Sequence, residues 1–177
     1  MIAVDLRAPV AEDASLCPAA DPFSLADANI NPITGLSTDY LNHFNEAIML
    51  LEMLPVMPEC RDDLAAWCPL SYHEHFDASH LRQRELTMAA YDLADPLIRR
   101  PFDALCETMN AMVLAACAAL QPNLPPDVAA MIAEQAAADL KPLIARASAL
   151  IHGFDRDGSD SDPLAESQAL VDAILTP

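Results

Sequence analysis

Two stretches of this chain repeat apolar side chains at the spacing of an α-helix, and this repeat constrains the fold most. In the first stretch the apolar positions are Tyr40, Phe44, Ala47, Ile48, Leu51 and Leu54. In the second they are Phe102, Leu105, Met109, Met112, Val113, Ala116 and Leu120. Residues three, four and seven apart share one helix face, so each stretch presents a stripe that needs burial. The sequence therefore predicts amphipathic helices around a common core.

Proline, glycine and capping residues mark the expected helix boundaries. The expected helices span residues 38–54, 61–67, 79–94, 101–120, 126–152 and 164–175. Ser37 or Thr38 caps the first helix, and Pro96 interrupts the chain before a new helix begins near Pro101, a favourable first-turn position. Gly153 ends the long helix, which is expected to bend near its internal proline.

The domain organisation follows from this pattern and from length. A chain of 177 residues is the size of one ordinary domain, and strand signals are nearly absent. Residues 1–35 carry four prolines and no sustained period, so they predict an irregular N-terminal arm. Residues 36–177 are expected to form the bundle domain. The predicted fold is all-α, a single-domain bundle of about five helices.

The chain is strongly acidic. With 27 acidic and 9 basic side chains, the formal net charge is −18. This field repels nucleic acid and anionic membrane surfaces, so neither is expected as a partner. It attracts cations or a basic protein partner. Only three glycines occur, which argues against a glycine-rich phosphate-binding loop.

Cysteine usage and the N-terminus bear on the compartment. The five cysteines are odd in number and form no CxxC pair, which favours a reducing environment. The first residues lack a basic start followed by an apolar run, so no signal peptide is expected. No run of 18 apolar residues is free of charge, so no membrane span is expected. A cytoplasmic location is the resulting expectation.

Three of the five histidines, His73, His75 and His80, fall within eight residues. If the segment is extended at its start, His73 and His75 point the same way, and His80 can fold back from the next helix. With a cysteine or carboxylate nearby, such imidazoles could hold Zn²⁺ or a related divalent metal. In the alternative interpretation these are loop residues, and Asp77 or Ser79 caps the following helix.

A second candidate lies on the first long helix, where His43 is expected at the border of the apolar stripe and Glu46 lies one turn on. A half-buried histidine beside a carboxylate could be a general base, a metal ligand or a phosphoryl acceptor. The sequence lacks the paired Glu-x-x-His motifs of di-iron bundles. The alternative is a boundary histidine whose hydrogen bonds are satisfied by Glu46 or a backbone carbonyl.

A third candidate is the acidic loop after residue 154. Numbered as an EF-hand loop, it supplies oxygen ligands from Asp155, Asp157, Ser159 and Glu166, so calcium is the expected ion. Asp160 stands where the EF-hand needs glycine, which predicts weak binding. The alternative is a solvated acidic linker.

Four of the nine basic residues lie close together in the sequence: Arg82, Arg84, Arg99 and Arg100. An arginine–carboxylate network that joins helices is the expected use. The alternatives are a small-anion site or a docking patch for an acidic partner.

The sequence contains no recognisable motif that pairs a catalytic nucleophile with a general base. The leading hypothesis is therefore a non-enzymatic helical protein that acts through protein–protein contacts, as a regulator or assembly factor, with a protein partner or a second copy of itself. One alternative is a metal-binding bundle that uses His43 and Glu46 with the histidines at 73–80. The other is a histidine phosphotransfer bundle with His43 as acceptor.

Overall fold

A computed structural model of the chain describes residues 22–153. Its seven α-helices are α1 (Pro22–Asp27), α2 (Asn42–Met53), α3 (Cys60–Ala66), α4 (Tyr72–Ala78), α5 (Arg84–Leu93), α6 (Pro96–Ala119) and α7 (Pro126–His152). A 3-10 helix, Thr38–Leu41, leads into α2. Within the described range the one β feature is an isolated bridge between Ile30 and Ser37. The predicted all-α class is confirmed, with more helices than the expected five.

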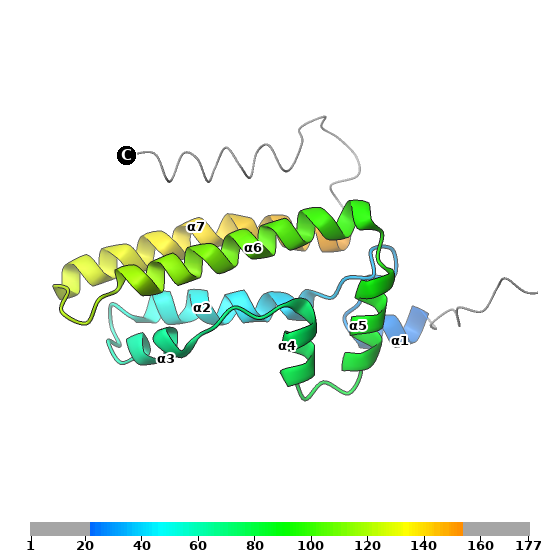
Figure 1. Cartoon of the computed structure of the whole chain (residues 1–177), viewed down its shortest axis with the longest axis horizontal. Coiled ribbons are helices and arrows are strands. Elements are labelled where there is room, and N and C mark those ends of the chain that lie inside the picture. Colours follow the sequence, from blue (N-terminus) through cyan, green and yellow to red (C-terminus); the bar gives the residue numbers. More distant parts are fainter. Residues whose placement is uncertain (1–21, 154–177) are drawn as a thin grey trace, which may run out of the picture.

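Three long helices organise the molecule (Figure 1). α6 and α7 lie side by side as an antiparallel pair, and α2 packs against both of them. α3 lies against α2 at the end of the bundle where α6 connects to α7. α4 and α5 pack on each other and project from the opposite half. The fold therefore has two separate ends, one built around α3 and one around α4 and α5.

The predicted apolar stripes form the core. Its largest fully buried side chains include Phe44, Leu51, Phe76, Phe102, Met109, Leu140 and Ile151. α7 contributes small residues at four-residue spacing, Ala129, Ala133 and Ala137, which are all buried. Small side chains in this register let neighbouring helices approach closely while the large side chains of α2 and α6 fill the remaining space.

The predicted start of the second long helix is wrong. α6 begins at Pro96, where the Asp95 carboxylate accepts a hydrogen bond from the Leu97 backbone N–H at 2.9 Å. Proline in the first turn costs no hydrogen bond, so Pro96 begins the helix where the sequence indicated an interruption. Pro101 removes one internal bond, but Ile98 and Phe102 are buried on either side and hold the helix together.

The predicted helix 79–94 is also wrong at its start. The chain forms α4 over residues 72–78, and α5 begins at Arg84. The N-terminus of α4 has a capping box: the Ser71 Oγ accepts from the Glu74 N–H, and the Glu74 carboxylate accepts from the Ser71 N–H at 2.8 Å. Ser79 ends α4 instead of capping a following helix.

The other expected boundaries agree with the structure. Ser37 is the cap of the 3-10 helix that precedes α2, and α7 spans residues 126–152 with Pro142 inside it. Gly153 ends α7 in the left-handed conformation, at φ 76°. The described part of the predicted arm contains α1 and a turn over residues 31–35. The expected helix at 164–175 lies outside the described residues.

α6 alone among the helices of residues 22–153 is long and apolar enough to cross a membrane, a criterion of length and composition only. In this fold its Phe102, Met109 and Val113 side chains lie in the core against the other helices. The core helix of a bundle passes the same criterion.

Candidate functional site

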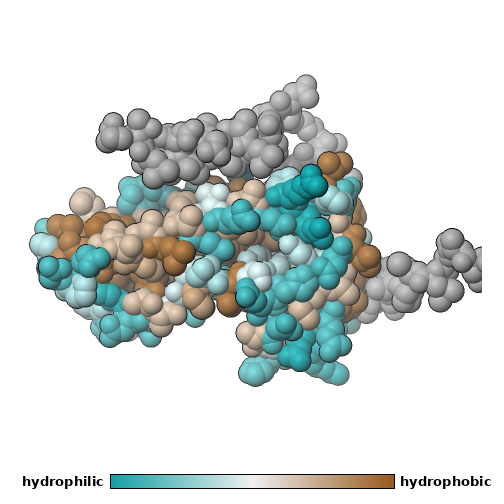
Figure 2. All heavy atoms as spheres, in the orientation of Figure 1, coloured by the Kyte–Doolittle hydropathy of each residue, from teal (hydrophilic) through white to brown (hydrophobic). Residues whose placement is uncertain are grey.

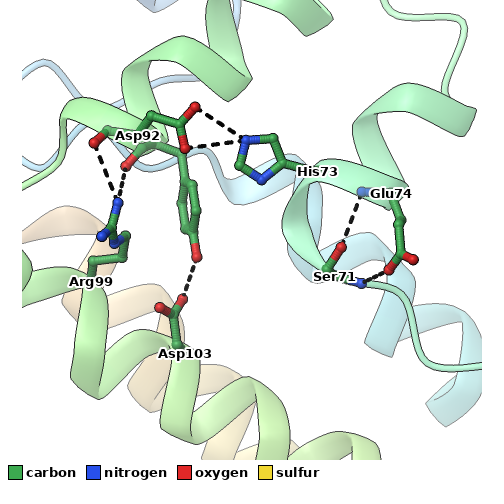
Figure 3. Close-up of polar contacts among 7 residues, drawn as sticks. Ser71, His73, Glu74, Asp92, Arg99 and Asp103 are labelled. Atoms are coloured by element: carbon green, nitrogen blue, oxygen red, sulfur yellow. Dashed lines mark hydrogen bonds and ion pairs between the residues drawn. The ribbon is translucent and has the colours of Figure 1, made fainter.

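The histidines at 73–80 do not converge. Because residues 72–78 are helical, side chains two positions apart point about 200° away from each other. His73 points to α5, where its Nε2 lies 3.2 Å from the Asp92 carboxylate (Figure 3). His75 instead faces the 3-10 helix and α2, with its ring centroid 5.5 Å from that of Tyr40. His80 is exposed in the connection that follows α4.

The structure does bring His75 to His43, in an aromatic cluster. Their ring centroids lie 5.9 Å apart. The His43 ring stacks on Trp67 at 4.6 Å with an interplanar angle of 19°, and the Trp67 indole N–H donates to the His43 backbone carbonyl. These contacts join the residue after α3 to α2 and α4. His43 therefore serves as part of the core, further inside than the boundary position that its sequence predicts.

Burial favours the neutral form of both imidazoles. Desolvation first, and the neighbouring His75 second, lower the pKa of His43 to about 4. Burial also lowers the pKa of His75, although the backbone of Asp39 and the carboxylates of Asp39 and Glu46 act in the opposite direction. His43 is only 6% exposed, and its Nε2 has no hydrogen-bond partner in the described part of the chain. The expected pairing with Glu46 is therefore not found, and a phosphoryl acceptor would need an accessible ring.

This buried histidine predicts a specific pH dependence. Between its folded pKa of about 4 and its ordinary value of 6.5, the unfolded chain binds a proton that the folded chain does not. Stability therefore falls as the pH drops through this window. From about pH 7 to about pH 5, urea titrations should show wild type losing about 1–2 kcal/mol more free energy of unfolding than His43→Leu. Parallel pH curves for the two proteins would show that His43 does not carry this dependence.

An open cleft of about 440 Å³ runs beside His43. Its lining includes Glu46 from α2, Asp63 from α3 and Cys68 from the following segment. Within residues 22–153, however, no three His, Cys, Asp or Glu side chains are grouped so that they could hold a metal ion. The calcium candidate with Asp155, Asp157, Ser159 and Glu166 lies outside the described residues. His43 and His75 thus belong to an aromatic cluster, and His73 contacts the Asp92 carboxylate.

The end of the bundle around α3 exposes apolar and acidic side chains together. Residues 55–63, which we call the acidic–apolar end, present Val56 and Met57 beside Glu59, Asp62 and Asp63. Val56 is 79% exposed, and only Leu97, at 82%, is more exposed among the large apolar side chains of residues 22–153. Figure 2 shows hydrophobic and hydrophilic side chains gathered at this end of the molecule, on the left of the view.

Two contacts fix the acidic–apolar end against the α6–α7 hairpin. The Arg61 guanidinium donates to the Gln121 backbone carbonyl at 3.3 Å, and the Cys117 thiol donates to the Leu64 carbonyl at 3.4 Å. The N–H groups of Val56 and Met57 both donate to the Met53 carbonyl. The exposed apolar side chains are thus held on an ordered turn.

A second cleft, of about 320 Å³, lies between α6 and the segment that leads into α4. We call it the tyrosine–carboxylate cleft; its lining is Tyr40, Pro69, Leu70, Ser71, Tyr72, Tyr91, Asp103, Cys106, Glu107 and Asn110. The Tyr91 hydroxyl donates to the Asp103 carboxylate at 2.8 Å (Figure 3). The Tyr40 hydroxyl donates to the Leu70 carbonyl at 2.6 Å.

The electrostatics of this second cleft differ from those of a catalytic centre with an activated nucleophile. Burial raises the pKa of the Cys106 thiol well above its ordinary value, so the sulfur stays protonated. Burial also raises the pKa of Asp103, while the Tyr91 hydroxyl and the Arg99 guanidinium oppose this shift. A bound cation would stabilise the ionised form of the half-buried Asp103 carboxyl, which lies beside Glu107.

Arg84 and Arg99 contact backbone carbonyls instead of the carboxylates that the predicted arginine–carboxylate network requires. Arg99 donates to the backbone carbonyls of Tyr91 and Asp92, and its guanidinium lies 5.3 Å from the centre of the Tyr91 ring. Arg84 donates to the Asp77 carbonyl. These two arginines therefore donate to carbonyls at the ends of α4 and α5, and side-chain spacing does not reveal such contacts.

Sequence reasoning missed the tyrosine–carboxylate cleft, although one signal was present. Asp103, Cys106, Glu107 and Asn110 are spaced by three, four and seven residues, so they share one face of α6 at the edge of its apolar stripe. The partners of that face come from other elements, and only the fold brings them together. No protein-family model, curated protein or solved structure matches this chain.

Proposed function

We propose that this protein is a non-enzymatic helical domain, a regulator or assembly factor, that binds a basic amphipathic segment of a protein partner at its acidic–apolar end. The observation that carries the proposal is the exposure of Val56 and Met57 among three carboxylates on an ordered turn. Exposed apolar side chains with a rim of one charge are typical of a protein interaction surface.

The charges of this surface select the partner. Glu59, Asp62 and Asp63 are exposed around the two apolar side chains. Arg61, the one basic residue in this stretch, is directed to the Gln121 carbonyl and leaves the surface negative. A partner with Lys or Arg beside apolar anchors complements this pattern, and the net charge of −18 favours its approach.

The turn is also ordered before it binds. Pro55 and Pro58 restrict the backbone on both sides of the apolar pair, and hydrogen bonds to the Met53 carbonyl hold the turn. A surface that is already in its binding conformation loses less conformational entropy on association. The acidic–apolar end therefore meets the physical requirements of a docking site better than a mobile loop would.

A designed helical peptide with leucine on one face and lysine on the other tests this proposal. Fluorescence anisotropy should show saturable binding to the full-length protein. The double variant Val56→Ser, Met57→Ser should bind about tenfold more weakly, because two anchors are removed. The matched control is Leu93→Ser, Leu97→Ser at the other end, where Leu97 is 82% exposed; its affinity should stay within about twofold of wild type.

Reversing the charge of two acidic side chains at the acidic–apolar end provides a second test of the peptide-binding proposal. Glu59→Lys with Asp62→Lys should weaken binding and reduce its dependence on salt. Equal losses in the Val56 and Leu97 double variants, or equal binding of a peptide with glutamate in place of lysine, would show that the acidic–apolar end is not the docking site.

A further inference from the structure

We propose that the tyrosine–carboxylate cleft is a second binding site, specific for a primary ammonium group carried by a small amine or by a lysine side chain. It lies on a different part of the molecule from the acidic–apolar end. A negative result for one proposal therefore does not count against the other.

The charge of the lining points to a cation. Asp103 and Glu107 are one turn apart on α6 and both line the cleft. No Lys, Arg or His of the described residues lines it. Arg99 acts electrostatically on Asp103, but its guanidinium lies over the Tyr91 ring and donates to the Tyr91 and Asp92 carbonyls, outside the lining. The carboxylates of the cleft thus lack a charged partner inside it.

The hydrogen-bonding pattern points to a ligand that donates. The Tyr91 and Tyr40 hydroxyls already donate within the protein, to Asp103 and Leu70. The Asn110 Oδ1 is buried and has no partner among the described residues, which is costly unless a ligand or solvent donates to it. Oxygens of Asp103 and Glu107 therefore remain as acceptors for a ligand in the cleft. A primary ammonium group has three N–H donors to offer them.

The tyrosines supply the apolar part of the site. Tyr72 and Tyr91 stack with ring centroids 4.2 Å apart, and Tyr40 packs against Tyr72 at 5.1 Å. Arg99 and Tyr72 already contact the Tyr91 ring, so the cleft is not an open aromatic cage for a quaternary ammonium. The aromatic walls instead exclude water from one side and strengthen charge-assisted hydrogen bonds on the other. They also offer a surface for the carbon chain of an amine.

Isothermal titration of the full-length protein with 1,4-diaminobutane tests this site. We expect saturable binding, with tetramethylammonium and 1,4-butanediol each at least about tenfold weaker, because the first lacks donors and the second lacks charge. A peptide with a single lysine is the second ligand. Tighter binding of the diamine would assign the site to small amines, and tighter binding of the peptide would assign it to a protein side chain.

Two conservative variants keep the test separate from folding. Asp103→Asn preserves an acceptor for the Tyr91 hydroxyl, and Glu107→Gln changes an exposed side chain. Together they should weaken diamine binding about tenfold while the melting temperature stays near wild type. Glu134→Gln, an exposed carboxylate on α7 outside the lining, should leave binding unchanged.

The proposal would be overturned by any of three results. These are the absence of saturable binding at millimolar amine, equal binding of diamine and diol, or full binding by the Asp103→Asn, Glu107→Gln protein. None of them bears on the peptide experiment at the acidic–apolar end, because its variants lie on a different surface.

Discussion

Replacing Phe44 by alanine should lower the free energy of unfolding by about 3–5 kcal/mol. Phe44 lies on α2 where that helix packs against α7, and it is completely buried. Its ring also packs edge-on against Tyr40 and His43, with centroids 5.6 Å and 5.3 Å away. Alanine would remove this apolar area and leave a cavity that rigid neighbouring helices cannot close.

Chemical denaturation of the purified variant measures this loss. Met49→Ala on the same helix is the matched control, because Met49 is 51% exposed and its truncation should cost less than about 1 kcal/mol. Both substitutions place alanine in a helix, so propensity cannot explain a difference. Similar midpoints for the two variants would mean that α2 does not bury the face described here.

Replacing Gly35 by alanine should destabilise the fold by about 2–4 kcal/mol. Gly35 has a φ of 72°, a conformation that L-residues rarely adopt. A Cβ there would lie 2.8 Å from the backbone carbonyl oxygen of Ala90, so the turn would have to move away from α5. The same turn is tied to α7, because the Thr34 hydroxyl donates to the Ile151 carbonyl at 2.7 Å.

Gly153 is the matched control for this turn. Its φ of 76° gives the same backbone strain, but a Cβ there would meet nothing closer than Thr34 Cγ2 at 3.9 Å. Gly153→Ala should therefore cost about 1 kcal/mol, and the excess at Gly35 measures the steric contact alone. Thermal melting of both variants tests this. Equal losses would contradict the close approach of the turn to α5.

The parts of the fold that the sequence predicts correctly depend on residues within one helix. The stripes of α2 and α6, the extent of α7 and its end at Gly153 follow from spacing and from single capping residues. The start of α6 was misplaced because proline at 96 can either interrupt a helix or begin one. The hydrogen bond from the Leu97 N–H to the Asp95 carboxylate decides between the two, and it is seen only in the structure.

The candidate sites were harder to predict because their geometry depends on several elements. Periodicity places His43 at a helix border, but Trp67, which buries it, comes from beyond α3. His73 and His75 are neighbours in sequence and diverge in space, because the Ser71–Glu74 capping box makes their segment helical. Asp103 and Glu107 line a cleft only because α4 and α5 place tyrosine side chains opposite them.

The two proposed binding surfaces lie on different parts of the fold. The long pair of α6 and α7, with α2 against it, separates the acidic–apolar end from the α4–α5 half (Figure 1). We propose a basic protein segment as the ligand of the first surface and an ammonium group as the ligand of the tyrosine–carboxylate cleft. Both proposals rest on the acidic character of the chain and on apolar side chains that lie beside the charges.

Amide chemical-shift mapping of the isotopically labelled, full-length protein is the most direct test that the acidic–apolar end is the docking site. Titration with the leucine–lysine peptide should shift residues 55–63 first and most, with saturation, and shift residues 103–110, which line the proposed ammonium site, only at higher peptide concentration. Shifts centred on residues 103–110, or small shifts spread over the whole acidic surface without saturation, would contradict it.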